Sequence, residues 1–221
     1  MYQYDYEHPA VTTDVVIFTV REQCLKLLLI KRAGKPFKGK WALPGGFVAM
    51  DESLDDGARR ELEEETGVSG VYLEQLYTLG KPDRDPRERV ITVVYYALIP
   101  SDKLQLRAAT DAEAVGWFGM DELPALAFDH DEIVKMAEER LVAKLDYSTI
   151  AFQFMPEVFT LSELQDVYSI ILQEEIDKRN FRKWVLAMES IEETGQMRRD
   201  GPHRPAKLYR VKAPGKVEII K

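Results

Sequence analysis

Acidic residues and glycines in the segment 46–68 carry the strongest chemical signal in the sequence. Glu61, Glu64 and Glu65 are separated by three and four positions, so in a helix their carboxylates share one face. Three like charges on one face repel each other unless a cation neutralises them. Hard divalent ions such as Mg²⁺ take oxygen ligands and bind through a few carboxylates together with substrate phosphates. The spacing therefore predicts a divalent-metal site.

The neighbouring residues add to this prediction. Arg60 lies four positions before Glu64 and can hold that carboxylate in place. Residues 41–46 form a strand end that breaks into a Gly-Gly turn, whose backbone carbonyls could also reach the ion. A solvated acidic helix face is the alternative interpretation. It explains the charges, but it does not explain the glycine turn, Glu52 and the Arg-Glu order together.

Hydrophobic patterning predicts the elements that position these residues. A helix is predicted over 53–66, because Ser53 can cap its start and Gly67 can end it. Strands are predicted over 11–20, 25–31, 71–79, 89–99 and 115–118, and a second helix over 129–145. His130, at the start of that second helix, is expected at the surface or flanking the helix. Strands mixed with helices that pack on them indicate an α+β fold.

The pattern changes near residue 147. Thr160 and Glu163 have the spacing of a capping box ahead of an apolar-periodic run, and another helix is predicted over 180–188. A basic loop and a strand over 207–212 follow. Helix, turn, helix and basic hairpin is the layout of a winged helix-turn-helix. We therefore predict two domains, 1–147 and 148–221.

Composition limits the possible functions. The 221 residues are 45% hydrophobic and 31% charged, which is typical of a globular protein. No apolar stretch approaches the roughly 20 residues of a membrane span, and the acidic N-terminus is unlike a signal peptide. A single cysteine, Cys24, excludes an intramolecular disulfide. We expect a cytoplasmic protein that does not engage a membrane.

Charge is unevenly distributed along the chain. The net charge of −8 argues against a uniformly basic nucleic-acid binder, but residues 178–216 hold 11 Lys and Arg against 4 Asp and Glu. A recognition helix presents its first residues to base edges, and a basic wing meets phosphates. The candidate DNA-binding residues are Lys178, Asn180, Arg182, Lys183, Arg198, Arg199, His203, Arg204 and Lys207. A dimerisation or packing appendage is the alternative for this region.

Residues 46–68 resemble the Nudix box, G-x5-E-x7-R-E-U-x-E-E-x-G-U with U aliphatic, at all nine defined positions. The resemblance implies a Nudix α/β/α sandwich with a mixed sheet, and hydrolysis of a nucleoside diphosphate linked to another moiety with Mg²⁺ or Mn²⁺. The implied metal ligands are Glu61, Glu64, Glu65 and the Gly45 carbonyl, and Glu52 and Arg60 complete the catalytic set as braces. Asp111 and Glu113 are candidates for a further acid or base, with an exposed acidic loop as the alternative.

The segment 80–87 is charged and stiffened by prolines. A proline at this distance after the box, Pro82, resembles the ADP-ribose pyrophosphatase branch. Arg84 and Arg87 suit a diphosphate as bidentate donors, although a simply rigid loop is the alternative. An adenine could stack on Phe47, Phe37 or Trp41, each of which could equally belong to the core. The candidate substrate-binding residues are Phe47, Pro82, Arg84, Arg87 and Glu113.

Residues 159–183 and 204–210 resemble the C-terminal domain of the Nudix-related transcriptional regulators of NAD metabolism. This resemblance implies a Nudix domain that senses ADP-ribose or a related nucleotide, in a homodimer that binds a palindromic operator in double-stranded DNA. Three interpretations stay open. The chain could be a hydrolase of ADP-ribose or a similar nucleoside diphosphate sugar with a DNA-binding module, a repressor that only binds its effector, or a Nudix enzyme whose C-terminal domain builds a dimer.

Overall fold

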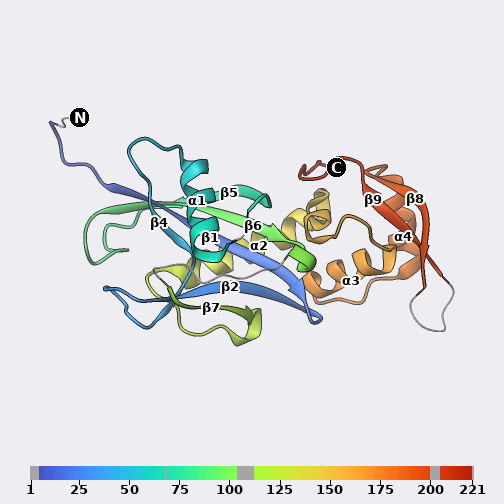
Figure 1. Ribbon diagram of the computed structural model, residues 1–221, viewed down its shortest axis with the longest axis horizontal. Coiled ribbons are helices and arrows are strands. Elements are labelled where there is room, and N and C mark those ends of the chain that lie inside the picture. The colour runs from blue at the N-terminus through green and yellow to red at the C-terminus, as the bar shows by residue number, and fades with distance from the viewer. Residues whose placement is uncertain (1–4, 68, 104–111, 200–204, 221) are drawn as a thin grey trace. The chain divides into compact units, whose positions relative to one another are not determined.

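A computed structural model describes residues 5–67, 69–103, 112–199 and 205–220 (Figure 1). The chain forms two compact units that interleave along the sequence. The first unit comprises Met1–Phe18, Lys26–Ala97 and Gln105–Glu138, and the second unit comprises Thr19–Leu25, Leu98–Leu104 and Glu139–Lys221. Because the units interleave, the domain boundary between residues 147 and 148 stays a prediction.

One sheet forms the centre of the first unit. In the described residues it has seven strands, ordered β3-β2-β1-β6-β5, with β4 paired to β1 and β7 paired to β2. The strands are β1 (Ala10–Arg21), β2 (Cys24–Arg32), β3 (Trp41–Ala42), β4 (Gly45–Phe47), β5 (Tyr72–Leu79), β6 (Val90–Ile99) and β7 (Ala112–Gly119). The glycine segment differs from its prediction as a turn, because β4 pairs antiparallel with β1 and Gly45 lies opposite Asp14.

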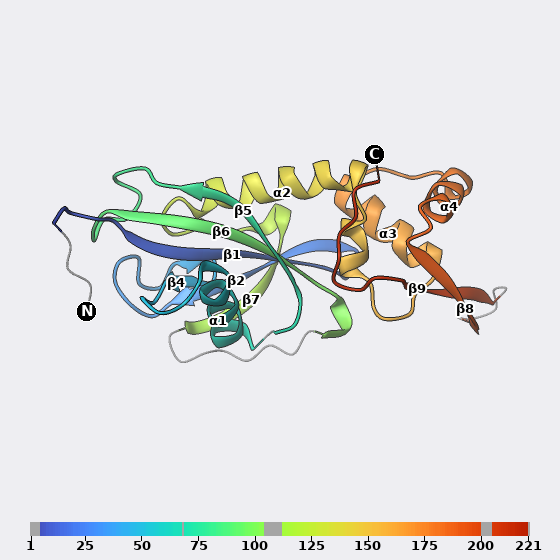
Figure 2. The same cartoon turned by 90° about the horizontal axis from the view of Figure 1, so that it is seen from above.

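Helices cover both faces of this sheet. Figure 2 shows α1 (Leu54–Thr66) on one face and α2 (His130–Tyr147) on the other. The central strands β1 and β6 each contain eight consecutive buried residues, as expected for strands that are covered on both faces. The predicted α+β sandwich is therefore confirmed.

Local signals define the ends of α1. The Ser53 side chain accepts a hydrogen bond from Asp56 N at 3.2 Å, and Gly67 adopts a left-handed conformation while its N–H donates to Glu63 O. Ala58 and Leu62 form the buried side of the helix. Of the acidic residues of the box on α1, Glu64 is exposed and Glu61 is buried.

The second unit has the winged-helix layout. Its C-terminal elements are η3 (Ile150–Phe154), α3 (Leu161–Leu172), α4 (Lys178–Ala187), β8 (Ile191–Arg198) and the antiparallel β9 (Ala206–Val211). The capping box of Thr160 and Glu163 is present at the start of α3. Tyr168 of α3 packs edge-on against Phe181 and Trp184 of α4, with ring centroids 5.3 and 5.4 Å away.

The other two 3₁₀ turns among the described residues are η1 (Ser101–Lys103) and η2 (Met120–Glu122). Every helix in the described part of the chain is too short or too polar to cross a bilayer.

Candidate functional site

Arg60 organises the acidic end of α1. Its guanidinium donates to both oxygens of Glu52, at 3.0 Å from Nε and 2.7 Å from Nη2. Nη1 donates to Glu61 at 2.6 Å and to Glu64 at 3.2 Å. These hydrogen bonds, with Glu52 first, raise the pKa of Arg60 above its ordinary value. One permanent cation therefore orients three of the predicted carboxylates.

Glu52 joins the loop before α1 to the helix itself. Besides Arg60, its Oε1 accepts a hydrogen bond from Ala49 N at 2.7 Å. The hydrogen bonds from Arg60 and then from Ala49 lower the pKa of Glu52 to about 2. Glu52 thus stays ionised at neutral pH and closes the loop, which is the geometry expected of a brace.

Gly46 packs directly on Glu61. A Cβ at Gly46 would lie 2.4 Å from Glu61 Oε1, so this position has no room for a side chain. Glu61 is 8% exposed, and burial raises the pKa of its carboxyl while the Arg60 hydrogen bond opposes that shift. The backbone of β4 at Gly46 is therefore in contact with the buried carboxylate of Glu61.

The carboxylate oxygens of Glu61 and Glu64, together with the β4 backbone, suit a hard divalent cation. Glu61 and Glu64 bind the same Arg60 nitrogen, so their carboxylates converge, and Glu61 is pressed against the glycine backbone. The side chain of Glu65 lies outside the described part of the chain. Among the described residues, no three His, Cys, Asp or Glu side chains are grouped closely enough to form a complete metal site. The four-ligand set with Gly45 and Glu65 consequently stays a prediction.

A cavity of about 460 Å³ lies beside β4. This volume is within the range of about 300–1,000 Å³ that is typical of small-molecule sites. Three of the predicted substrate-binding residues line it, namely Phe47, Arg84 and Arg87. Pro82 is exposed and does not line the cavity, and the side chain of Glu113 and the whole of Asp111 lie outside the described residues.

One wall of the cavity combines aromatic rings with guanidinium groups. The Arg87 guanidinium lies 5.1 Å from the Phe47 ring centroid and 5.9 Å from that of Phe128, and Arg32 lies 4.9 Å from Phe128. Phe47 is 41% exposed, so its ring remains available to a ligand. A flat, anionic ligand would find both stacking surfaces and positive charge here.

The other two stacking candidates pack against protein side chains. Phe37 lies against Phe128 with ring centroids 4.8 Å apart, and Trp41 lies against Phe118 at the same distance. Neither lines the cavity. Of the three aromatic residues proposed from the sequence, the structure brings only Phe47 to the cavity.

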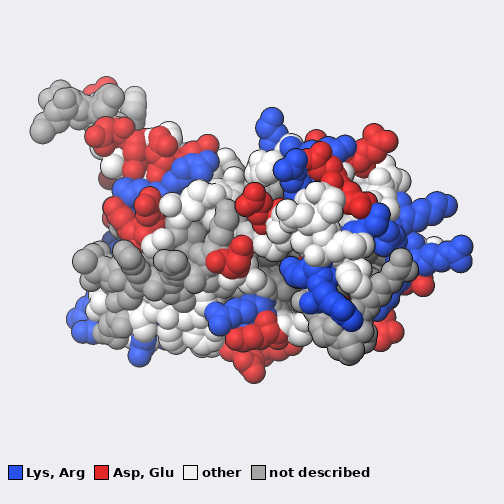
Figure 3. Space-filling view, turned by 45° about the vertical axis from the view of Figure 1, so that its right-hand side comes forward, with Lys and Arg blue, Asp and Glu red and all other residues white. Residues whose placement is uncertain are grey.

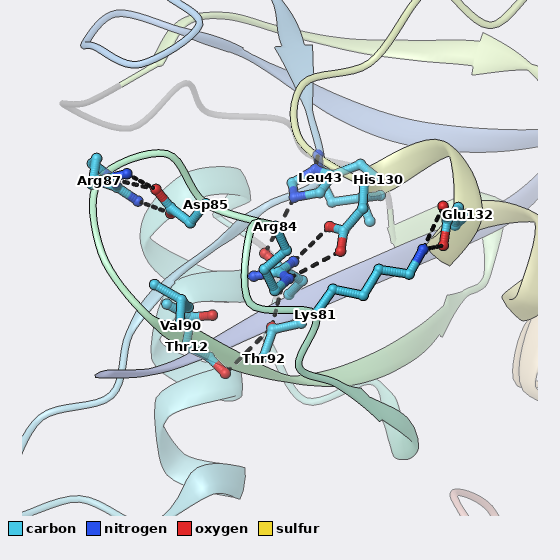
Figure 4. A network of polar contacts seen from close by, with 12 residues as sticks. Thr12, Leu43, Lys81, Arg84, Asp85, Arg87, Val90, Thr92, His130 and Glu132 are labelled. Carbon is cyan, nitrogen blue, oxygen red and sulfur yellow. Dashed lines mark hydrogen bonds and ion pairs between the residues drawn. The ribbon is translucent and has the colours of Figure 1, made fainter. Parts of the chain in front are cut away.

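Arg84 is held by two buried carboxylates. Its side chain is 4% exposed, donates to both oxygens of Asp129 at 3.0 and 2.7 Å, and lies 3.3 Å from Asp14 Oδ2. Lys81 in the same loop pairs with Glu132 of α2 at 2.8 Å (Figure 4). Arg84 therefore anchors the β5–β6 loop, as the rigid-loop alternative expected, while it also lines the cavity. Its role as a diphosphate donor stays a prediction.

His130 begins α2, as the helix-flanking expectation placed it, but it does not lie at the surface. It is 3% exposed, and its Nδ1 accepts a hydrogen bond from Leu43 N at 2.9 Å (Figure 4). Burial lowers the pKa of His130, which keeps the ring neutral and able to accept. The two partners are 87 positions apart, so no local pattern could have indicated this contact. The sequence also gave no signal for Asp14, Arg32 and Phe128, whose roles depend on packing.

The exposed side of α4 is basic. Lys178, Arg179, Arg182 and Lys183 are exposed together with Asn180, while Phe181 and Val185 face the interior. Figure 3 shows Lys and Arg side chains gathered over the end of the chain that carries α4. Arg182 and Lys183 form no ion pair with another described residue. Their charge is thus available to a polyanion.

The wing differs from α4, because several of its cations are paired. Arg198 pairs with Glu163 at the α3 N-terminus, and Lys207 pairs with Glu193 at 2.8 Å. Arg199 is exposed. His203 and Arg204 lie outside the described residues. The described part of the wing therefore carries less unpaired positive charge than α4.

Family models match most of the chain. The Nudix domain model matches residues 8–137, and the model described as the NrtR DNA-binding winged helix domain matches residues 151–211. These two segments contain the box with its cavity and the helix-turn-helix with its wing.

Similar proteins include both regulators and enzymes. The ADPR responsive transcriptional repressor NtrR of Acinetobacter baylyi is 40% identical over 93% of this chain and 83% of its own length. The ADP-ribose pyrophosphatase of Methanocaldococcus jannaschii is 43% identical over 59% of this chain and 73% of its own. The crystal structure of Shewanella oneidensis NrtR complexed with a 27mer DNA superposes with a TM-score of 0.82 at 39% identity, over 91% of this chain and 93% of that chain.

Proposed function

The chain belongs to the Nudix family, and from this premise we propose that it is a regulator that binds ADP-ribose, hydrolyses it, and binds DNA through its winged helix. The arrangement that carries the proposal is the set of carboxylates held by Arg60 and packed on the β4 glycines beside a nucleotide-sized cavity. The similar repressor and the similar pyrophosphatase both support ADP-ribose as the ligand.

The residues of the chain have separate tasks in this proposal. Mg²⁺ or Mn²⁺, held by Glu61, Glu64, Glu65 and the Gly45 carbonyl, would polarise the phosphate oxygens and lower the pKa of an attacking water. Arg60 and Glu52 keep the carboxylates and the preceding loop in place. Phe47 would stack on the adenine, and Arg87, which also pairs with Asp85 at 2.7 Å, would face the diphosphate. Phosphoryl chemistry requires little beyond such positioning and electrostatics.

The DNA-binding part of the proposal depends on α4. Its exposed basic face would enter the major groove, with Asn180 and Arg182 near base edges and the other cations of α4 and the wing near phosphates. We propose a homodimer on a palindromic operator, because a two-fold site requires a two-fold protein. A protein that binds chromosomal DNA would work in the compartment that holds the chromosome, which we take to be the cytoplasm.

Release of AMP from ADP-ribose in the presence of Mg²⁺ tests the enzymatic proposal. We expect turnover by the native chain and a loss of roughly 100-fold or more in the Glu65→Gln variant. Glu63→Gln is the matched control, since Glu63 is an exposed glutamate of the same helix outside the box pattern. A native chain that binds ADP-ribose without cleaving it would favour the second candidate, a sensor that only binds its effector.

A further inference from the structure

Residues 41–44, which lead into β4, form hydrogen bonds to other segments at Trp41, Leu43 and Pro44. Trp41 O accepts from Ala127 N at 2.8 Å, and Pro44 O accepts from Val15 N at 2.8 Å. Between them, Leu43 N donates to His130 Nδ1 at 2.9 Å. The first two are backbone hydrogen bonds, as are those that pair Trp41 and Ala42 with β2, whereas the Leu43 N–H donates to a side chain.

Leu43 has no alternative partner in solvent. The residue is 2% exposed, and a buried N–H without an acceptor is costly. Because His130 Nδ1 accepts, the ring proton is on Nε2, which faces Asp14 Oδ1 at 3.7 Å. The ring is therefore neutral, and only its acceptor nitrogen contacts the segment.

His130 is itself fixed by a buried polar network. Asp14 Oδ2 accepts from Thr92 Oγ1 at 2.7 Å and lies 3.3 Å from Arg84. Arg84 also holds Asp129, the residue that precedes His130. The network joins β1, β6, the β5–β6 loop and the start of α2, so the ring has little freedom to move.

We infer that His130 is a positioning residue for the metal site. Its Nδ1 fixes Leu43, and the chain then runs two residues to Gly45, whose carbonyl is a proposed ligand, and three residues to Gly46, which contacts Glu61. The described hydrogen bonds and ion pairs of His130 are with Leu43 and Asp14, neither of which is a proposed metal ligand. This inference rests on the metal-dependent function proposed above.

Two substitutions of His130 distinguish the effect of losing the hydrogen-bond acceptor from the effect of changing the side-chain volume. His130→Asn places an amide oxygen at the position of Nδ1, whereas His130→Leu fills similar space without an acceptor. We would titrate each full-length variant with Mn²⁺ in the absence of nucleotide and follow free Mn²⁺ by electron paramagnetic resonance. We expect the Leu variant to bind Mn²⁺ roughly five- to tenfold more weakly than the native chain, and the Asn variant to stay within about twofold.

Each outcome has a distinct meaning. Equal weakening in both variants would show that His130 acts only through packing, and unchanged affinity in the Leu variant would show that the acceptor does not matter. Either result overturns the inference while leaving the proposed function intact. A native chain that binds no Mn²⁺ would instead overturn the metal site itself, and the inference with it. If the Leu variant does not fold, His130→Phe takes its place, because it keeps a ring and still lacks the acceptor.

Discussion

At the scale of single residues, the contact between Gly46 and Glu61 leaves no space for a Cβ between β4 and the carboxylate. A Cβ at Gly46 would lie 2.4 Å from the Glu61 carboxylate, which must then move away from β4. Overpacking of this kind costs about 1–3 kcal/mol. We therefore expect Gly46→Ala to lower kcat/KM for ADP-ribose hydrolysis by roughly tenfold or more.

Gly80→Ala is the matched control for this substitution. A Cβ at Gly80 would meet Ile91 Cγ1 at 3.5 Å, an ordinary van der Waals distance, so kcat/KM should stay close to that of the native chain. A Gly46→Ala chain that is as active as Gly80→Ala would show that the close packing of β4 on Glu61 is not needed for catalysis.

The Glu52–Arg60 pair predicts a specific dependence of stability on pH. Its hydrogen bonds lower the pKa of Glu52 from the ordinary 4.5 to about 2, so the folded state favours the ionised form. The resulting stabilisation is fully present above pH 4.5 and is lost as the pH falls towards 2. We expect Glu52→Gln to reduce the free energy of unfolding most above pH 4.5 and progressively less below it, as urea denaturation at several pH values would show.

Glu63→Gln provides the comparison, because Glu63 is exposed and forms no ion pair with another described residue. Its free energy of unfolding should follow that of the native chain across the same pH range. A Glu52→Gln chain whose deficit stays constant down to pH 2 would contradict the assignment of the pKa shift to Glu52.

Residue types and spacing predicted the part of the site that lies within one helix. Arg60 and Glu64 are four positions apart on α1, so their contact follows from helical geometry. The contacts of Arg84 and His130 were not predicted, because their partners come from distant segments: the Arg84 carboxylates are 70 and 45 positions away. From the sequence alone, a charged residue in a polar loop is predicted to be exposed, because its distant carboxylate partners are not known.

At the scale of elements, the α1 and α3 helices were predicted accurately because their caps are local signals. Ser53, Gly67 and Thr160 each act on backbone groups within a few residues. The β4 strand was not predicted, since a glycine pair resembles a turn unless a partner strand is known. The polar strand β8 lacks the hydrophobic alternation that would identify it, and the sequence indicated only a basic hairpin there.

The contrast between α4 and the wing predicts different contributions to DNA affinity. Each lysine that neutralises a phosphate contributes about 0.9 to the slope of log K against log salt. Lys183 is exposed on α4 and forms no ion pair with another described residue, whereas Lys207 is paired with Glu193. We expect Lys183→Ala to reduce the slope by about one and Lys207→Ala to reduce it by less, measured with random-sequence duplex DNA by fluorescence anisotropy.

Lys135→Ala controls for net charge, because Lys135 is an exposed lysine of α2 in the first unit. This variant should keep the native slope. Equal slope changes in all three variants would mean that DNA responds to the overall charge of the chain, and that α4 is not a specific contact surface.

At the scale of the whole molecule, one chain combines a nucleotide site with a DNA-binding domain, and their coupling must be reciprocal. If ADP-ribose lowers the affinity for DNA by some factor, DNA must lower the affinity for ADP-ribose by the same factor. Allosteric factors of about 5–150 are typical. Glu65→Gln in EDTA permits both measurements, because the nucleotide is then not consumed.

We expect the two factors to agree, with the operator duplex first selected from a random pool and both dissociation constants measured by titration. With Mg²⁺, the native chain should regain DNA affinity as it cleaves the added ADP-ribose, whereas Glu65→Gln should remain released from DNA. Hydrolysis would then limit the duration of the signal that binding generates. If saturating ADP-ribose leaves the DNA affinity of Glu65→Gln unchanged, the two activities are independent, and the intact box serves catalysis without regulating DNA binding.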